Sequence, residues 1–218
     1  MNPGRPEFAG PRDRQATAAA LRSIVGDVVA EAVRAAGAGG VVVLDDWTPE
    51  GELAYEWLVA AIGEARIWRG ATVASNVQGV TGADAQVLGS RRFVQEHSGL
   101  TAHPCSKTAL LLGGRPPQAD LFPLGDLYAS QVARLAGGWS VPEDLRGLVA
   151  SAGGIDMLDA ALARLIDGRE PAEAALDSLA GDVAGEVLRL YERGRYYRLR
   201  PRLVPKLGAR TLGVDLFD

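Results

Sequence analysis

The sequence has little of what would place it in a membrane, in an oxidising compartment or on a nucleic acid. Its single cysteine, Cys105, excludes an internal disulfide and a cysteine-based metal cluster. No apolar run reaches the roughly 18 residues that cross a bilayer, and residues 1–14 lack the apolar centre of a secretion signal. The net charge of −4 gives no general excess of positive charge for binding nucleic acid. We therefore expect a cytoplasmic protein with neither a membrane nor a nucleic acid as partner.

The composition that remains is that of an ordinary globular protein. Hydrophobic residues make up 47% and charged residues 23% of the 218 positions, which is enough for one α/β domain with a sizeable core. Composition shifts predict three parts: a flexible leader over 1–15, a single domain over 16–193, and a basic, proline-containing tail over 194–218. We find no internal repeat.

Apolar patterning predicts strands that alternate with helices. A continuous β-branched run at 40–44 is typical of a central parallel strand covered on both faces, and further strands are predicted at 65–73 and 100–104. This alternation favours an α/β fold with a three-layer, doubly wound parallel sheet and a helical C-terminal half. The predicted helices, several of them ended by glycine, cover 16–36, 49–62, 90–99, 106–112, 127–136, 141–151, 155–167 and 171–193, and the tail is not expected to be helical.

The turn after the first strand, "DDWTPEGE" (45–52), carries four carboxylates. Thr48 has the character of an N-cap, with Pro49 at the first helical position and acids in the first turn. The same carboxylates could also gather a divalent cation, but their spacing does not converge on one ion. We predict a capped helix and no metal site.

A second turn, "AHPCSKT" (102–108), gathers reactive side chains. His103 and Cys105 point the same way on an extended segment, but a nucleophile would also need a third, orienting group. Ser106 is predicted to be an N-cap, and a helix N-terminus assisted by Lys107 could bind an anion. We therefore predict no catalytic residue here.

The segment that follows, "SKTALLLGGRPPQADLFPLGDLYASQVARLA" (106–136), resembles the ammonia-ligating domain of NAD synthetases, within the ATP-pyrophosphatase (adenine-nucleotide α-hydrolase-like) superfamily. "VPEDL", "GGIDMLDAAL" and "RYYRLRPRLVP" are also similar to family segments. The resemblance implies the same three-layer fold, a homodimer, and ATP and Mg²⁺ as cofactors if ligase activity is retained. The matching positions of the first segment are Gly113, Asp120, Pro123, Leu127, Gln131, Val132, Leu135 and Ala136.

The chain departs from the family at the positions that bind phosphate and metal in those enzymes. The family phosphate loop, Ser-Gly-Gly-x-Asp-Ser, falls on "WTPEGE" (47–52), so Thr48 and Pro49 replace the two glycines. Proline has no N–H to donate, and each carboxylate–phosphate charge pair costs about 4 kcal/mol at roughly 4 Å and an effective dielectric near 20. The family's metal-contacting Glu aligns with Ala109, and its lysine aligns with Ala129.

These departures predict a degenerate NAD synthetase-like protein, a pseudoenzyme without ligase activity. The resemblance places a tentative nucleotide or small-anion pocket at Trp47, Thr48, Ser106, Lys107, Thr108 and Asp120, with Trp47 partly filling the ATP cleft. Two alternatives stay open. One is an ATP-dependent amide-forming ligase of the NAD synthase type, acting on ammonia and deamido-NAD with an altered phosphate loop. The other is a homo-oligomeric interaction module.

Overall fold

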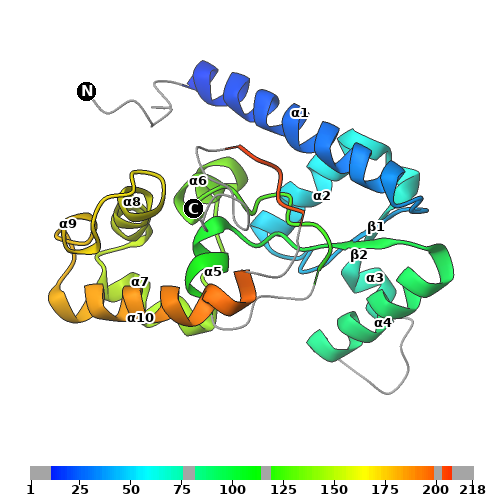
Figure 1. Cartoon of the computed structure of the whole chain (residues 1–218). Coiled ribbons are helices and arrows are strands. Elements are labelled where there is room, and N and C mark those ends of the chain that lie inside the picture. Colours follow the sequence, from blue (N-terminus) through cyan, green and yellow to red (C-terminus); the bar gives the residue numbers. More distant parts are fainter. Residues whose placement is uncertain (1–10, 76–81, 114–118, 199–202, 208–218) are drawn as a thin grey trace.

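The computed structural model describes residues 11–75, 82–113, 119–198 and 203–207 (Figure 1). Its centre is a parallel sheet of three short strands: β1 (Val41–Val43), β2 (Ile67–Arg69) and β3 (Leu100–Ala102), in the order β2-β1-β3. Val41 lies opposite Ile67 on one side and Leu100 on the other. Two parallel single-residue bridges, Ala102 to Leu121 and Leu121 to Leu203, continue the sheet beyond β3.

Strand β1 is buried on both faces, as its continuous apolar run predicted. Val41 and Val43 pack in one cluster with helices α1 (Pro11–Ala35) and α2 (Pro49–Ile62). Val42 points the other way, into a cluster with Val73 of α3 (Gly70–Ser75) and Phe93 of α4 (Gly82–His97). Because successive side chains of a strand alternate between faces, this three-residue strand packs against both helical layers. The three-layer parallel α/β architecture is confirmed.

The C-terminal half is helical, as predicted, and has a core of its own. That core includes Leu111, Leu145, Leu158, Leu162 and Val187, all fully buried. Its elements are α5 (Lys107–Leu112), α6 (Ala129–Ala136), the 3-10 turn η2 (Glu143–Leu145), α7 (Arg146–Ser151), α8 (Ile155–Ile166), α9 (Ala172–Ala175) and α10 (Gly181–Arg198).

Three predicted elements differ from the structure. The strand predicted over 65–73 is confined to β2, because a 3-10 turn, η1 (Glu64–Arg66), precedes it and α3 follows it. The helix predicted over 90–99 is the end of the longer α4. The helix predicted over 171–193 is split into α9 and α10 by a turn that includes Asp177 and Ser178, residue types whose side chains compete for backbone hydrogen bonds.

The two ends of the chain are described in part. Helix α1 begins at Pro11, inside the predicted leader, and α10 continues to Arg198, so the prediction of a non-helical tail is wrong for residues 194–198. Arg200, Arg202 and Arg210 of the basic tail lie outside the described residues. Within the described ranges, no helix is both long enough and apolar enough to cross a membrane.

The end of α1 shows why the predicted glycine stop works. Gly37 adopts a left-handed conformation with φ of 62°, and its N–H donates to the Arg34 carbonyl. The N–H of Ala38 donates to the Val33 carbonyl, which completes a Schellman cap. This cap turns the chain directly into β1.

Candidate functional site at the carboxyl end of the sheet

The turn after β1 is a tight helix cap. Asp45 takes a left-handed conformation with φ of 50°, and its carbonyl accepts hydrogen bonds from both the N–H and the hydroxyl of Thr48. Thr48 Oγ1 in turn accepts the N–H of Gly51 at 3.0 Å, and Pro49 occupies the first helical position. The predicted N-cap of α2 is confirmed.

Gly51 is packed against the backbone of this turn. A Cβ added at Gly51 would lie 2.0 Å from the Asp45 carbonyl oxygen, a distance that no side chain tolerates. The family phosphate loop aligns its aspartate with this position. An aspartate therefore cannot be accommodated on the backbone path that this turn follows.

The carboxylates of the turn are engaged with the protein itself. Glu50 is 7% exposed and accepts the Ser140 N–H at 3.1 and 3.3 Å through its two oxygens. Asp46, also buried, accepts the N–H of Ala71 in the first turn of α3 at 3.2 Å. No group of three or more His, Cys, Asp and Glu side chains suited to a metal ion occurs in the described part of the chain.

The remaining first-turn acid, Glu52, forms a bidentate ion pair with Arg69 of β2 at 2.6 and 2.7 Å. The hydrogen bond from Arg69 holds the pKa of Glu52 below its ordinary value. The Arg69 guanidinium also lies 3.8 Å from the centre of the Tyr55 ring and 3.7 Å from Asp46. The Arg69 guanidinium therefore neutralises acidic side chains of this turn.

His103 links the end of β3 to the end of β1. Its Nε2 lies 2.8 Å from Asp45 Oδ2, and its Nδ1 is buried without a hydrogen-bond partner among the described residues. One ring nitrogen of this imidazole is therefore paired with a carboxylate, and the other is enclosed.

The three residues that open α5 face the protein interior. Ser106 Oγ accepts the Ala109 N–H at 3.3 Å, which confirms the predicted cap. The Thr108 hydroxyl donates to Asp159 at 2.6 Å and accepts the Ala129 N–H at 2.9 Å. Lys107 is 1% exposed, and all three side chains are buried.

Lys107 ends in a cluster of charged and polar groups from the helical half. Its Nζ lies 2.8 Å from Asp167 and 3.5 Å from Asp126, and 4.9 Å from the centre of the Tyr128 ring. Tyr128 donates its hydroxyl to Asp167 at 2.9 Å. Burial and the neighbouring Asp167 raise the pKa of the Tyr128 hydroxyl. Burial likewise raises the pKa of Asp159, which also accepts the Ser130 N–H.

The other two members of the predicted pocket lie apart from this cluster. Trp47 is 65% exposed, and its partial filling of a cleft stays a prediction. It follows a tight turn that directs its indole into solvent. Asp120 is exposed and accepts both the N–H and the hydroxyl of Thr101 at 2.8 Å. Of the six predicted residues, the sequence neighbours Trp47 and Thr48 share the turn after β1, while Ser106, Lys107 and Thr108 share the turn after β3.

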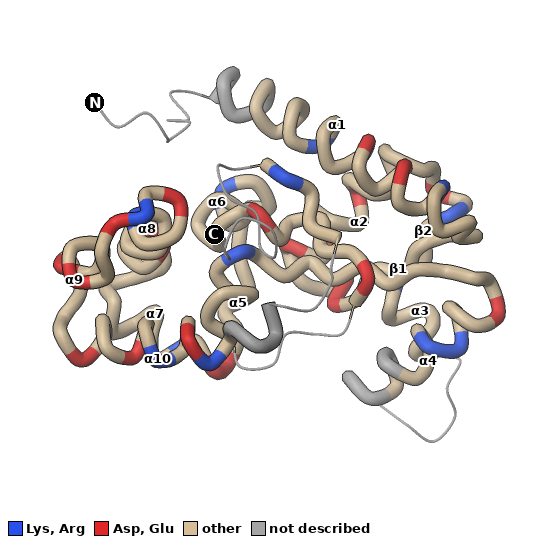
Figure 2. Tube along the Cα trace, viewed as in Figure 1, with Lys and Arg blue, Asp and Glu red and all other residues tan. Residues whose placement is uncertain are grey.

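Arg69, Ser140 and Asp167 complete these contacts and were not predicted. Arg69 carries a weak signal, because it is one of only two cations, with Arg66, in a predicted strand that is otherwise largely apolar. Ser140 acts through its backbone N–H, which any residue except proline supplies, so no sequence signal marks it. Figure 2 shows acidic and basic positions interspersed along α1, α8 and α10.

Comparison with known proteins identifies the fold. No protein-family model matches the chain, and no curated protein matches it at the sequence level. Among solved structures, it is similar to an NH3-dependent NAD synthetase from Campylobacter jejuni in complex with the nitrate ion. The TM-score is 0.56 at 14% identity, with 85% of this chain and 98% of that chain covered.

A second similar structure is a glutamine-dependent NAD+ synthetase from Acinetobacter baumannii in complex with ADP. It has a TM-score of 0.42 and 18% identity, and the match covers 91% of this chain but 48% of that one. At these identities the likeness concerns the fold alone. The chain has an NAD synthetase-like fold of the adenine-nucleotide α-hydrolase type, as the resemblance of its middle segment predicted.

Proposed function

We propose that this protein is a non-ligating member of the NAD synthetase-like fold, in which a self-contained turn stands where a phosphate loop would lie. The observation that carries the proposal is that most of the backbone N–H groups at the N-terminus of α2 already have acceptors within the turn. Of its first four residues, Pro49 has no N–H, and the N–H groups of Gly51 and Glu52 both donate to Thr48. Glu50 alone keeps a backbone donor, which is too few to cradle a pyrophosphate.

The charges at the turn support the same conclusion. Glu50 and Asp46 are buried carboxylates that hold neighbouring N–H groups, as a bound anion would. Each carboxylate would repel one negative charge of a phosphate by about 4 kcal/mol at a separation of roughly 4 Å and an effective dielectric near 20. Arg69 offsets little of this repulsion, because both ends of its fork bind Glu52.

A neighbouring loop adds a steric contribution. Gly138 follows α6 and packs on Pro49, so that a Cβ added there would lie 3.4 Å from Pro49 Cγ. Two residues later, Ser140 donates to Glu50. This loop therefore covers the first turn of α2, where a phosphate would have to approach.

Retained binding of an adenine nucleotide or small anion would have Trp47 as its exposed contact, because the Thr48 hydroxyl already donates to the Asp45 carbonyl and accepts the Gly51 N–H. Ser106, Lys107 and Thr108 are engaged inside the protein and would need to leave their partners first. We further propose a homodimer, which rests on the family resemblance and is tested by light scattering on the purified full chain. A cytoplasmic location, proposed from the composition, is tested by cell fractionation.

Isothermal titration with ATP, AMP and deamido-NAD, each with and without Mg²⁺, tests the proposal beside an active NH3-dependent NAD synthetase. We expect no magnesium-dependent binding of ATP and no pyrophosphate release in the presence of ammonia and deamido-NAD. Magnesium-dependent ATP binding with pyrophosphate release would overturn the proposal and establish the alternative, an ATP-dependent amide-forming ligase.

A further inference from the structure

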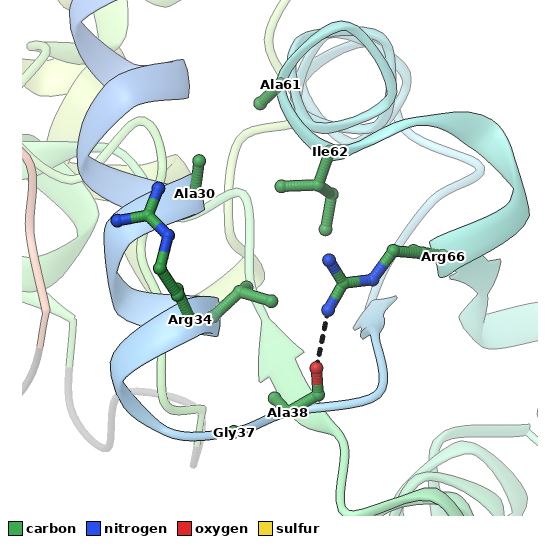
Figure 3. A pocket seen from close by; sticks show the side chains of 8 residues that line it. Ala30, Arg34, Gly37, Ala38, Ala61, Ile62 and Arg66 are labelled. Atoms are coloured by element: carbon green, nitrogen blue, oxygen red, sulfur yellow. Dashed lines mark hydrogen bonds between the residues drawn. The ribbon is translucent and has the colours of Figure 1, made fainter.

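A pocket of about 430 Å³ lies at the opposite end of the sheet from the Asp45 turn (Figure 3). It is bounded by the last turns of α1 and α2, by the loop that enters β1 and by Arg66, which directly precedes β2. Its position at the amino ends of the strands separates it from the site described above. Its volume is within the range of roughly 300–1,000 Å³ that is typical of small-molecule sites.

Small side chains create this hollow. Helices α1 and α2 are closely packed at Gly26, where an added Cβ would lie 3.3 Å from Ala61 Cβ. The pocket opens one turn further along α1, at Ala30, where alanines on both helices leave the space between them unfilled. Val33 and Ile62 complete its apolar wall.

Two arginines provide the polar groups of the pocket. Figure 3 shows Arg34 on the α1 side, with its guanidinium turned along the helix and away from Arg66, which enters from the η1 side. Arg66 donates through Nη2 to the Ala38 carbonyl at 2.6 Å and through Nε to the Gly39 carbonyl at 3.2 Å, which fixes its guanidinium in place. These bonds use one edge of the group, so the edge bearing Nη1 is left for a ligand. The eight residues that line the pocket include no carboxylate.

The charge balance selects a single negative charge. Both helices end here, and each helix end contributes roughly half a negative charge, about one in total, against the two guanidinium groups. About one positive charge remains when a ligand replaces Glu31 as the partner of Arg34, which suits a monocarboxylate better than a phosphate ester carrying nearly two negative charges. Glu31, one turn before Arg34 and outside the pocket, pairs with Arg34 at the surface and competes with a ligand.

We propose that this pocket binds a small organic monocarboxylate, with its carboxylate on the open edge of Arg66, where Arg34 reaches it by turning from Glu31, and its apolar body against Ala30, Val33 and Ile62. The site does not depend on the proposed loss of ligase activity, because the two lie at opposite ends of the sheet.

The test is isothermal titration of the full chain with 3-phenylpropionate, its uncharged amide and phenyl phosphate. We expect saturable binding of the carboxylate that exceeds binding of the other two probes. Arg34→Gln should weaken binding about ten-fold, the effect of losing a hydrogen bond to a charged group. Glu31→Gln should strengthen it about two- to five-fold, because the competing surface pair is removed.

Ala30→Leu, which fills the pocket, should abolish binding, whereas Arg22→Gln, on an exposed position of α1 outside the pocket, should leave it unchanged. Near-ultraviolet circular dichroism of each variant shows that the fold is intact. Arg34→Gln and Glu31→Gln change exposed side chains, so they remain informative if Ala30→Leu fails to fold.

Three results would overturn the proposal: no binding of 3-phenylpropionate at millimolar concentration, equal binding of its amide, or tighter binding of phenyl phosphate. Affinities for the carboxylate that are unchanged in both Arg34→Gln and Glu31→Gln would overturn it as well.

Discussion

Lys107 Nζ lies 2.8 Å from Asp167 Oδ1, and this ion pair joins the first residue of α5 to the residue that ends α8. Lys107 is one of two lysines in a sequence with 23 basic residues, and it is among the largest fully buried side chains of the protein. The pair links two helices of the helical half, α5 and α8, across sixty residues of sequence. A residue that resembles an anion-binding lysine in the sequence is thus structural in the fold.

Replacing Lys107 by Met should therefore destabilise the protein strongly. The substitution leaves the buried carboxylate of Asp126 and the partly buried carboxylate of Asp167 without this ammonium group, and breaking a buried pair costs about 3–5 kcal/mol. Urea unfolding measures the loss. Arg22→Met, at an exposed position of α1, is the control and should change stability by at most about 0.5 kcal/mol. Equal effects of the two variants would show that the buried pair contributes nothing.

Gly51→Ala should destabilise the turn after β1. The added methyl group would be 2.0 Å from the Asp45 carbonyl oxygen, so the backbone must shift, at a cost of about 1–3 kcal/mol or more. Gly185→Ala in α10 is the control, because its Cβ would meet nothing within 4 Å and should stabilise the helix by about 0.5–1 kcal/mol. Opposite signs in thermal unfolding are expected. A neutral Gly51→Ala would contradict the described turn.

Thr48→Ala should lower stability by about 1 kcal/mol, because it removes the acceptor for the Gly51 N–H and the donor to the Asp45 carbonyl. Thr48→Ser keeps the hydroxyl and should stay close to the parent protein. Chemical unfolding distinguishes the two variants. If serine were as costly as alanine, the threonine methyl group and not the cap would be responsible.

Asp159 should make stability depend on pH. Burial raises its pKa from the ordinary value of 3.8, so the folded state holds this proton more tightly than the unfolded state. The free energy of unfolding that it contributes is therefore highest below pH 3.8 and falls as the pH rises towards the folded pKa. Asp159→Asn removes this titration.

Urea unfolding of the parent protein and Asp159→Asn between pH 4 and pH 7 checks the sign. We expect the parent's stability, relative to the variant, to decrease as the pH rises. A relative stability that increases with pH would mean that hydrogen bonds from Thr108 and Ser130 outweigh burial and lower the pKa of Asp159.

Local signals predicted much of the fold, because they act through neighbouring residues. Thr48 and Ser106 cap the residue three positions ahead, and Gly37 caps the residues just before it. The apolar run at β1 indicated a strand covered on both faces, which needs no knowledge of the helices that cover it. Errors occurred where a short signal was ambiguous, as at 70–75, where a strand-like apolar pattern forms α3.

The sequence by itself determined where the strands lie and which residues cap the helices, since each of these depends on residue types within one turn of chain. Only the tertiary structure decided what the charged residues do. Glu50 meets the Ser140 N–H across 90 positions, and Lys107 meets Asp167 across 60. The interaction between two charges depends on their distance in space. The residue pattern along the chain does not give that distance for two elements that pack together.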